Sequence, residues 1–166
     1  MSALTRYGDW DFNFQPSALA AVPTDIFDTE KSLKLNGSTL QLKYYGPAHT
    51  DCDISVNFSE ADILHVGDTF WNAIYPFIDY STGGSIGGMI KATEANLHGA
   101  PVSNRKDLSS YRDMLVTIHD NVTRLKQRGS SIEETVSAKP TAAYDAKWGQ
   151  FVITPEFFVR LFYQGV

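Results

Sequence analysis

The first residues that suggest chemistry lie in the loop over residues 45–53, which reads YGPAHTDCD. Its His49 follows a Gly-Pro pair, and two acids and the chain's one cysteine, Cys52, come directly after it. Imidazole, thiolate and carboxylate are the donors that zinc takes in proteins, so this loop is a candidate metal-binding segment. A single histidine is more often structural, however, and His-x-x-Cys is only half of a zinc site. Both interpretations stay open at this point.

A second candidate is Asp68, which follows the short apolar run over 63–66. The run predicts a buried strand, and acids after a strand often line a site at the edge of a sheet. Such acids also cap turns without any further role. Within the run, His65 is interpreted as a structural histidine, on the expectation that it is buried. The glycine-rich segment 83–88 fits neither the dinucleotide nor the P-loop spacing, so we interpret it as a loop that allows close helix–sheet packing.

Alternating apolar residues predict the strands that position these loops. Over 33–44 apolar and polar residues alternate on both sides of an Asn-Gly pair, which predicts a β-hairpin. A further alternating strand is expected over 54–58, and the run over 63–66 gives the next one. His49 therefore falls in the loop after the hairpin, and Asp68 falls at the end of the last strand.

The second half of the chain has helical periodicity. Apolar residues recur at three- and four-residue spacing over 86–97 and again over 108–125. Asn104 is the expected N-cap of the longer helix and Gly129 its stop. A capping box over 131–134 predicts a short third helix, and Thr154-Pro155 opens a last one.

The composition is that of an ordinary globular protein, with 43% hydrophobic and 20% charged residues among 166. A net charge of −5 argues against a nucleic-acid partner. No apolar run approaches about 18 residues and no signal segment opens the chain, so we expect no membrane partner and a cytoplasmic location. One cysteine excludes an internal disulfide. We expect a single domain, with an irregular N-terminal arm over 1–31 that holds one short strand, and a body over 32–166.

Several motifs together resemble the metallo-β-lactamase superfamily. GPAHT at 46–50 is followed by a strand and then by ADILHVGD at 61–68, and the pattern continues through FWN and YPFID within 70–79. It resumes with HGAPVS at 98–103, before the long helix. The resemblance is most specific over 44–90.

This resemblance implies an α/β fold, mostly the C-terminal half of an αββα sandwich, with one sheet and flanking helices. It also implies a metal-dependent hydrolase, usually with zinc. Carried over residue by residue, His49 completes the first metal site, Asp68 bridges two metals, and His98 is the last ligand of the second site. A carboxylate between two cations lets them share and activate one hydroxide. The family's His-x-His-x-Asp-His motif is absent, so four of the usual ligands are missing, and the half that carries them would lie before residue 1.

We therefore expect a metallo-β-lactamase-fold hydrolase family member with an incomplete metal site and weak or no activity. His49, Asp68 and His98 would hold at most one ion, of zinc or ferrous iron, and Asp68 is the catalytic candidate. The substrate would be a small molecule of unidentified class. The alternative is a catalytically inactive remnant that acts as an oligomerisation or binding module. In either case a half sandwich leaves one face of its sheet uncovered, so a homodimer or larger even oligomer is expected.

Overall fold

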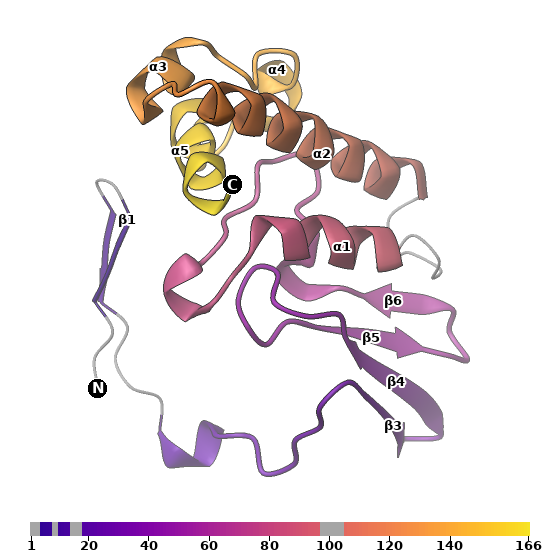
Figure 1. Cartoon of the computed structure of the whole chain (residues 1–166). Helices are drawn as coiled ribbons and strands as arrows, with labels where there is room; N and C mark the ends of the chain where they lie inside the picture. The colour runs from indigo at the N-terminus through magenta and orange to yellow at the C-terminus, as the bar shows by residue number, and fades with distance from the viewer. Residues whose placement is uncertain (1–3, 8–9, 14–17, 97–104) are drawn as a thin grey trace.

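The central element of this computed structural model is a four-stranded antiparallel sheet in the order β3-β4-β5-β6 (Figure 1). The structure describes residues 4–7, 10–13, 18–96 and 105–166. The strands of the sheet are β3 (Glu30–Leu35), β4 (Ser38–Tyr44), β5 (Ile54–Phe58) and β6 (Ile63–His65). The predicted α/β class with one sheet and flanking helices is confirmed.

The β3–β4 hairpin turns where the sequence predicts it. Asn36 and Gly37 both have positive φ, at 50° and 80°, which is the conformation that a two-residue hairpin turn with the right twist requires. Asparagine and glycine tolerate this conformation better than other residues, so the pair fixes the register that sets Leu35 opposite Ser38.

The arm that precedes the sheet contains more structure than the sequence predicts. Strands β1 (Leu4–Tyr7) and β2 (Trp10–Asn13) form a separate antiparallel pair, followed by the 3₁₀ turn η1 (Leu19–Ala21). The expectation of one short strand missed the partner strand, because the alternation over these few residues is too weak to show both. Figure 1 shows this pair standing apart from the main sheet.

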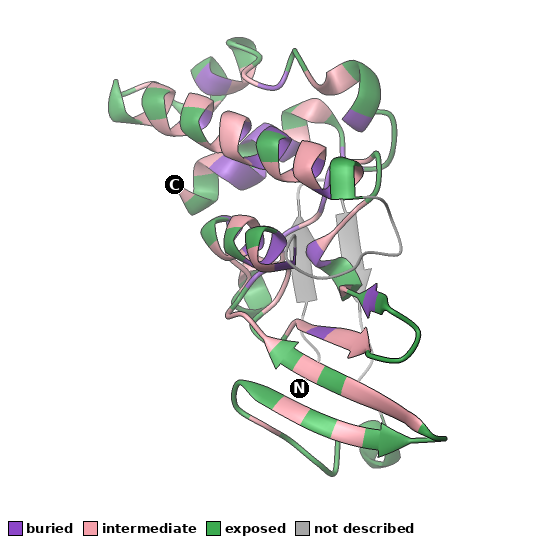
Figure 2. Cartoon of the chain, turned by 90° about the vertical axis from the view of Figure 1, so that its right-hand side faces the viewer, coloured by how far each residue is buried: buried purple, intermediate pink, exposed green. Residues whose placement is uncertain are grey.

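The two faces of the main sheet differ in polarity. Ser55 and Leu64 are buried and lie on the face toward α1 (Ile86–Asn96), where the Ser55 hydroxyl donates to Asn96 Oδ1 at 2.9 Å. Because neighbouring residues of a strand alternate between faces, the opposite face follows from the strand register. We call it the apolar sheet face, and it consists of Leu33, Leu35, Leu40, Leu42, Tyr44, Ile54, Val56, Phe58 and Ile63. In Figure 2 the strands β3 and β4 alternate between exposed and intermediate positions, with no buried residue.

Strand β6 corrects one expectation. The run over 63–66 was predicted to be a buried strand, but among the described strands β6 pairs only with β5 and lies at the edge of the sheet. Leu64 is buried while Ile63 and His65 are exposed. The expectation that His65 is buried is therefore wrong, and the backbone amide of Gly67 donates to its Nδ1 at 3.3 Å. A continuous apolar run cannot show which strand of a sheet is left at the edge.

The helices form layers above the sheet, with α1 between the sheet and α2 (Figure 1). The predicted capping box is present: the Ser131 hydroxyl accepts from Glu134 N, and the Glu134 carboxylate accepts from Ser131 N, which lowers the pKa of that carboxyl. Thr154 caps the last helix as predicted. Besides α1, the helices are α2 (Arg105–Gln127), α3 (Ile132–Ser137), α4 (Asp145–Trp148) and α5 (Pro155–Gly165).

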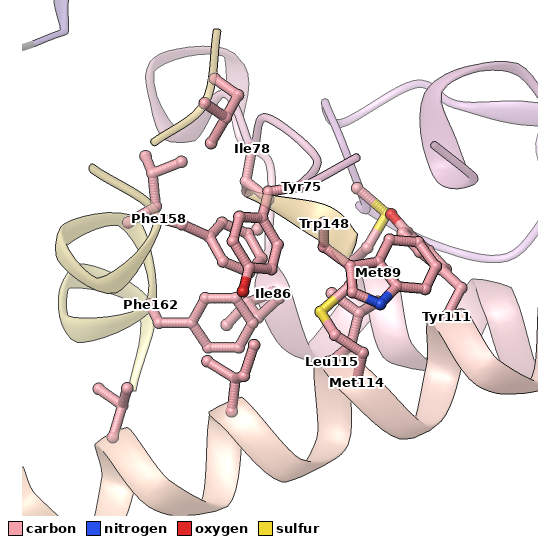
Figure 3. Close-up of a cluster of buried hydrophobic side chains, with 14 of the residues drawn as sticks. Tyr75, Ile78, Ile86, Met89, Tyr111, Met114, Leu115, Trp148, Phe158 and Phe162 are labelled. Carbon is pink, nitrogen blue, oxygen red and sulfur yellow. The ribbon is translucent and has the colours of Figure 1, made fainter. Parts of the chain in front are cut away.

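The hydrophobic core lies between the helices rather than on the apolar sheet face. Its largest fully buried side chains include Tyr75 from the segment before α1, Met89 from α1, Met114 from α2, and Phe158 and Phe162 from α5 (Figure 3). The strongly apolar α5 is thus accounted for by burial against its own chain. Among the described residues, no helix has both the length and the apolar character needed to cross a membrane.

Candidate metal site

The sheet topology brings the two predicted loops to the same end of the strands. Strands β4 and β6 both pair antiparallel with β5, so they run parallel to each other and their C-terminal ends lie on the same side of the sheet. The loop after β4 carries His49, and the turn after β6, η2 (Gly67–Thr69), carries Asp68. As a result His49 Nε2 lies 3.9 Å from Asp68 Oδ2. The pair expected from the sequence is therefore brought together in space.

His49 is held in one orientation by its surroundings. Its Nδ1 lies 2.8 Å from the carbonyl oxygen of Phe77, and because a carbonyl can only accept, Nδ1 carries the proton. The other ring nitrogen, Nε2, faces the Asp68 carboxylate. The rings of Trp71 and Phe77 lie 6.2 and 5.9 Å from the imidazole, whose side chain is 16% exposed. Proteins orient metal-ligating histidines in this way, by a hydrogen bond at the other ring nitrogen.

The loop that carries His49 is held by hydrogen bonds to the Asp53 side chain and to the backbone of Asp79. Asp53 accepts from Thr50 N at 2.6 Å and from Thr50 Oγ1 at 3.2 Å, which closes the turn after the histidine. The His49 carbonyl accepts from Asp79 N at 2.8 Å. Cys52 does not have positive φ, and it lies exposed with its amide donating to Thr50 Oγ1.

The turn that carries Asp68 is held in place by a buried network of hydrogen bonds around Thr69. Thr69 is buried and donates to Val66 O at 2.7 Å. From α1, the Thr93 hydroxyl donates to Thr69 O at 3.4 Å, and Asn96 Nδ2 donates to Thr69 Oγ1 at 3.5 Å. These hydrogen bonds tie the end of β6 and helix α1 to the turn that carries Asp68. The Asp68 side chain itself stays 64% exposed and is accessible to a ligand.

Trp71 and Phe77 are the site residues that sequence reasoning missed. Trp71 donates its indole N–H to Asp68 O at 2.9 Å and its ring neighbours His49, so it contacts both candidate ligands. Phe77 acts through its carbonyl oxygen, which no side-chain pattern can reveal. The only signal was the dense aromatic stretch after Asp68.

The donor atoms present fit a metal ion in part. Zinc bonds of roughly 2.0–2.2 Å at a tetrahedral angle hold two donor atoms about 3.4 Å apart. The 3.9 Å between His49 Nε2 and Asp68 Oδ2 is somewhat wider, so the two side chains would have to close slightly to share one ion. Within the ranges that the structure describes, no third His, Cys, Asp or Glu joins them in a metal-binding group. His98, the third predicted ligand, lies outside the described residues.

The glycine-rich segment 83–88 allows close packing, but against the loop that carries His49 and not against the sheet, and its last three residues belong to α1. A Cβ on Gly84 would lie 2.4 Å from His49 O, and one on Gly88 would lie 1.6 Å from Pro47 O. The absence of side chains at these two positions lets the start of α1 lie directly against the loop that carries His49. The Ser85 hydroxyl accepts from Gly88 N at 3.1 Å and caps the same helix.

Comparison with solved structures shows where this fold occurs. The sec-alkylsulfatase Pisa1 from Pseudomonas sp., a stereoselective inverting enzyme, matches with a TM-score of 0.62 and 14% identity. A double mutant of the sec-alkyl sulfatase PisA1 matches with a TM-score of 0.62 and 16% identity. Each match covers 84% of this chain but only 26% of the alkylsulfatase chain. The chain thus spans about a quarter of the length of these structural relatives, and at this identity they show the fold alone.

Comparison with families gives a more specific result. A search of curated proteins finds no match. The sequence model of the metallo-beta-lactamase superfamily, in contrast, matches residues 3–121, which is more than half of the chain. This agrees with the motifs over 44–90 and with the antiparallel sheet whose edge carries His49 and Asp68. The chain belongs to the metallo-beta-lactamase superfamily.

Proposed function

We propose that this chain is a metal-dependent hydrolase of its superfamily with an incomplete metal site, in which His49 and Asp68 are the ligands for one zinc ion. The observation that carries the proposal is the orientation of His49, whose Nδ1–H donates to Phe77 O and whose Nε2 faces the Asp68 carboxylate. His98 remains the candidate for a third ligand, since two histidines and one carboxylate suit zinc with open positions. The substrate would be a small molecule.

The chemistry follows from the residues at the sheet edge. A zinc ion held there supplies a Lewis acid and lowers the pKa of a bound water. His49 would contribute Nε2 as the nitrogen donor, because its Nδ1–H donates to Phe77 O. Asp68 contributes an exposed carboxylate oxygen. The Trp71 and Phe77 rings limit water on one side of the imidazole.

Zinc is expected to stabilise the folded protein through this pair. At a free zinc concentration 100 times the dissociation constant, linkage predicts about 2.7 kcal/mol of added stability. We expect the melting temperature to rise with zinc in the wild type, and this rise to disappear in His49→Ala and Asp68→Asn. His119→Ala is the matched control, because His119 lies on α2 beside Asp120. An equal rise in wild type and both site variants would contradict the assignment of these ligands.

Hydrolysis is expected to be weak. The missing ligands remove both a second ion and a fixed position for the water, and loss of positioning alone is worth several orders of magnitude in rate. We expect zinc-loaded protein to turn over nitrocefin or a secondary alkyl sulfate far below the median of about 10 per second for enzymes. Turnover at that rate, dependent on zinc and lost in Asp68→Asn, would show that the site is complete after all.

The second candidate function is an inactive member that serves as a binding or oligomerisation module. Two observations favour it: the described residues supply only two ligands, and the apolar sheet face is not buried. The two functions separate in the zinc titration. A module of this kind would show no zinc-dependent rise in melting temperature and no turnover, while its association would be unaffected by His49→Ala.

A further inference from the structure

Tyr111 on α2 is a fully buried tyrosine whose hydroxyl is not explained by core packing. Its ring meets Phe70 edge-to-face at a centroid distance of 5.2 Å and lies tilted against Trp148 at 5.8 Å (Figure 3). The hydroxyl oxygen, however, is buried without a hydrogen bond of good geometry to any described group. Such a hydroxyl lowers the stability of a fold, because it has left water without gaining a partner. A phenylalanine would make the same ring contacts without this cost, so the hydroxyl has a reason other than core stability.

The groups that act on this hydroxyl belong to the segment that carries Asp68 and Trp71. Burial raises the pKa of the Tyr111 hydroxyl well above its usual value, the backbone amide of Trp71 lowers it, and the charge of Asp68 raises it further. The hydroxyl is therefore protonated at neutral pH, with the Trp71 amide beside its oxygen. Within the described residues the Trp71 amide donates to no backbone carbonyl. The amide and the hydroxyl oxygen are thus each available to the other.

Trp71 connects Tyr111 to both candidate ligands. Its indole N–H donates to Asp68 O at 2.9 Å, and its ring lies 6.2 Å from the His49 imidazole. The 3.9 Å between His49 Nε2 and Asp68 Oδ2 is slightly wider than the spacing at which one zinc ion holds two donors. When the two side chains close on an ion, Trp71 moves with the turn to which it is bonded. A small movement of this kind turns a close contact of poor geometry into a hydrogen bond, as often happens when a site is loaded.

We propose that Tyr111 is a positioning residue of the metal site, whose hydroxyl accepts a hydrogen bond from the Trp71 amide when His49 and Asp68 close on one zinc ion. This role rests on the proposed function, since it takes these two side chains as the ligands. Because Tyr111 is fully buried, it acts through Trp71 and not on the ion or a substrate. Helix α2 then supports the loaded site from Tyr111, in addition to the hydrogen bonds that α1 makes to the turn.

Tyr111→Phe tests the proposal, because it removes the hydroxyl and keeps the ring. We expect the metal-free variant to resist urea at least as well as the wild type, since the hydroxyl has no partner there. We expect its zinc affinity, measured by isothermal titration calorimetry, to fall about 10-fold, the lower end of the range for groups that orient metal ligands. Tyr163→Phe is the matched control, because the Tyr163 hydroxyl donates to Ser130 O at 2.8 Å in an ordinary hydrogen bond. The control is expected to lose stability and to keep wild-type zinc affinity.

Hydrogen exchange measured by nuclear magnetic resonance follows the proposed hydrogen bond directly. Zinc should protect the Trp71 backbone amide from exchange in the wild type and not in Tyr111→Phe. Equal zinc affinity in these two proteins, or a Trp71 amide that zinc leaves unprotected, would overturn the role of Tyr111 and leave the His49 and Asp68 assignment in place. A metal-free Tyr111→Phe protein that is clearly less stable than the wild type would show that the hydroxyl serves the core instead. A wild type that binds no zinc would overturn the proposed function, and the role of Tyr111 with it.

Discussion

Gly88→Ala is expected to disrupt the metal site while Gly87→Ala, one residue earlier in α1, is expected to leave it intact. A Cβ on Gly88 would lie 1.6 Å from the carbonyl oxygen of Pro47, closer than any two nonbonded atoms approach. The obstructing atom belongs to the backbone, so no rotamer change relieves the overlap. Either α1 or the loop that carries His49 must move by more than 1 Å, on the order of the displacement that costs about 100-fold at a functional site.

The two variants are expected to change the free energy of unfolding in opposite directions. Overpacking against a backbone typically costs about 1–3 kcal/mol in the free energy of unfolding, and we place Gly88→Ala at the upper end or above. Displacing the partner that orients a metal ligand typically costs about 10–100-fold in metal affinity. For Gly87 the nearest atom to an added Cβ is Ser85 Oγ at 3.9 Å, so alanine there should add about 0.5–1 kcal/mol through helix propensity.

Urea unfolding and zinc titration of both variants measure these effects. We expect a lower midpoint and weaker zinc binding for Gly88→Ala, and a slightly raised midpoint with wild-type zinc binding for Gly87→Ala. If Gly88→Ala were as stable as the wild type and bound zinc equally well, the close packing of α1 on the His49 loop would be wrong.

The sequence predicts those parts of the fold that depend on local signals. The Asn36-Gly37 turn, the capping box at Ser131, and the Thr154 cap each have a short-range physical cause, and each is confirmed. The long helix is predicted because six apolar positions recur on one face, and all but one of them are buried along α2. The short α4 was not predicted, since four residues are too few to show a period.

The candidate site is only partly accessible from sequence. His49 and Asp68 were identified by residue type and by resemblance, and the antiparallel pairing of β4, β5 and β6 explains why they meet. The role of the Phe77 carbonyl could not be predicted, because a backbone atom has no sequence signature. The edge position of β6 among the described strands could not be predicted either, because strand order in a sheet is set by tertiary packing.

Phe158→Ala is expected to have the largest effect on stability of the substitutions in the core. The Phe158 side chain is fully buried, stacks on Tyr75 with ring centroids 4.2 Å apart, and meets Phe162 edge-to-face at 4.7 Å (Figure 3). Burial raises the pKa of the Tyr75 hydroxyl, which stays protonated and donates to Asp145 Oδ1 at 2.8 Å. Tyr75 is thereby fixed and cannot move to fill the space that the missing ring would leave.

Removing a buried phenylalanine typically costs about 3–5 kcal/mol, and aromatic contacts add to the loss. For a chain of this size we expect a fall in melting temperature of roughly 6–20 °C. Phe151→Ala is the matched control, since Phe151 is 57% exposed and should cost less than about 0.5 kcal/mol. Differential scanning calorimetry on both variants gives the comparison.

The same substitution should also affect the metal site. Because Tyr75 lies two residues before Phe77, the cavity should loosen the carbonyl that orients His49. Zinc affinity should therefore fall in Phe158→Ala and stay unchanged in Phe151→Ala. Equal melting temperatures for the two variants would contradict the position of this core between α5 and the segment that supports the site.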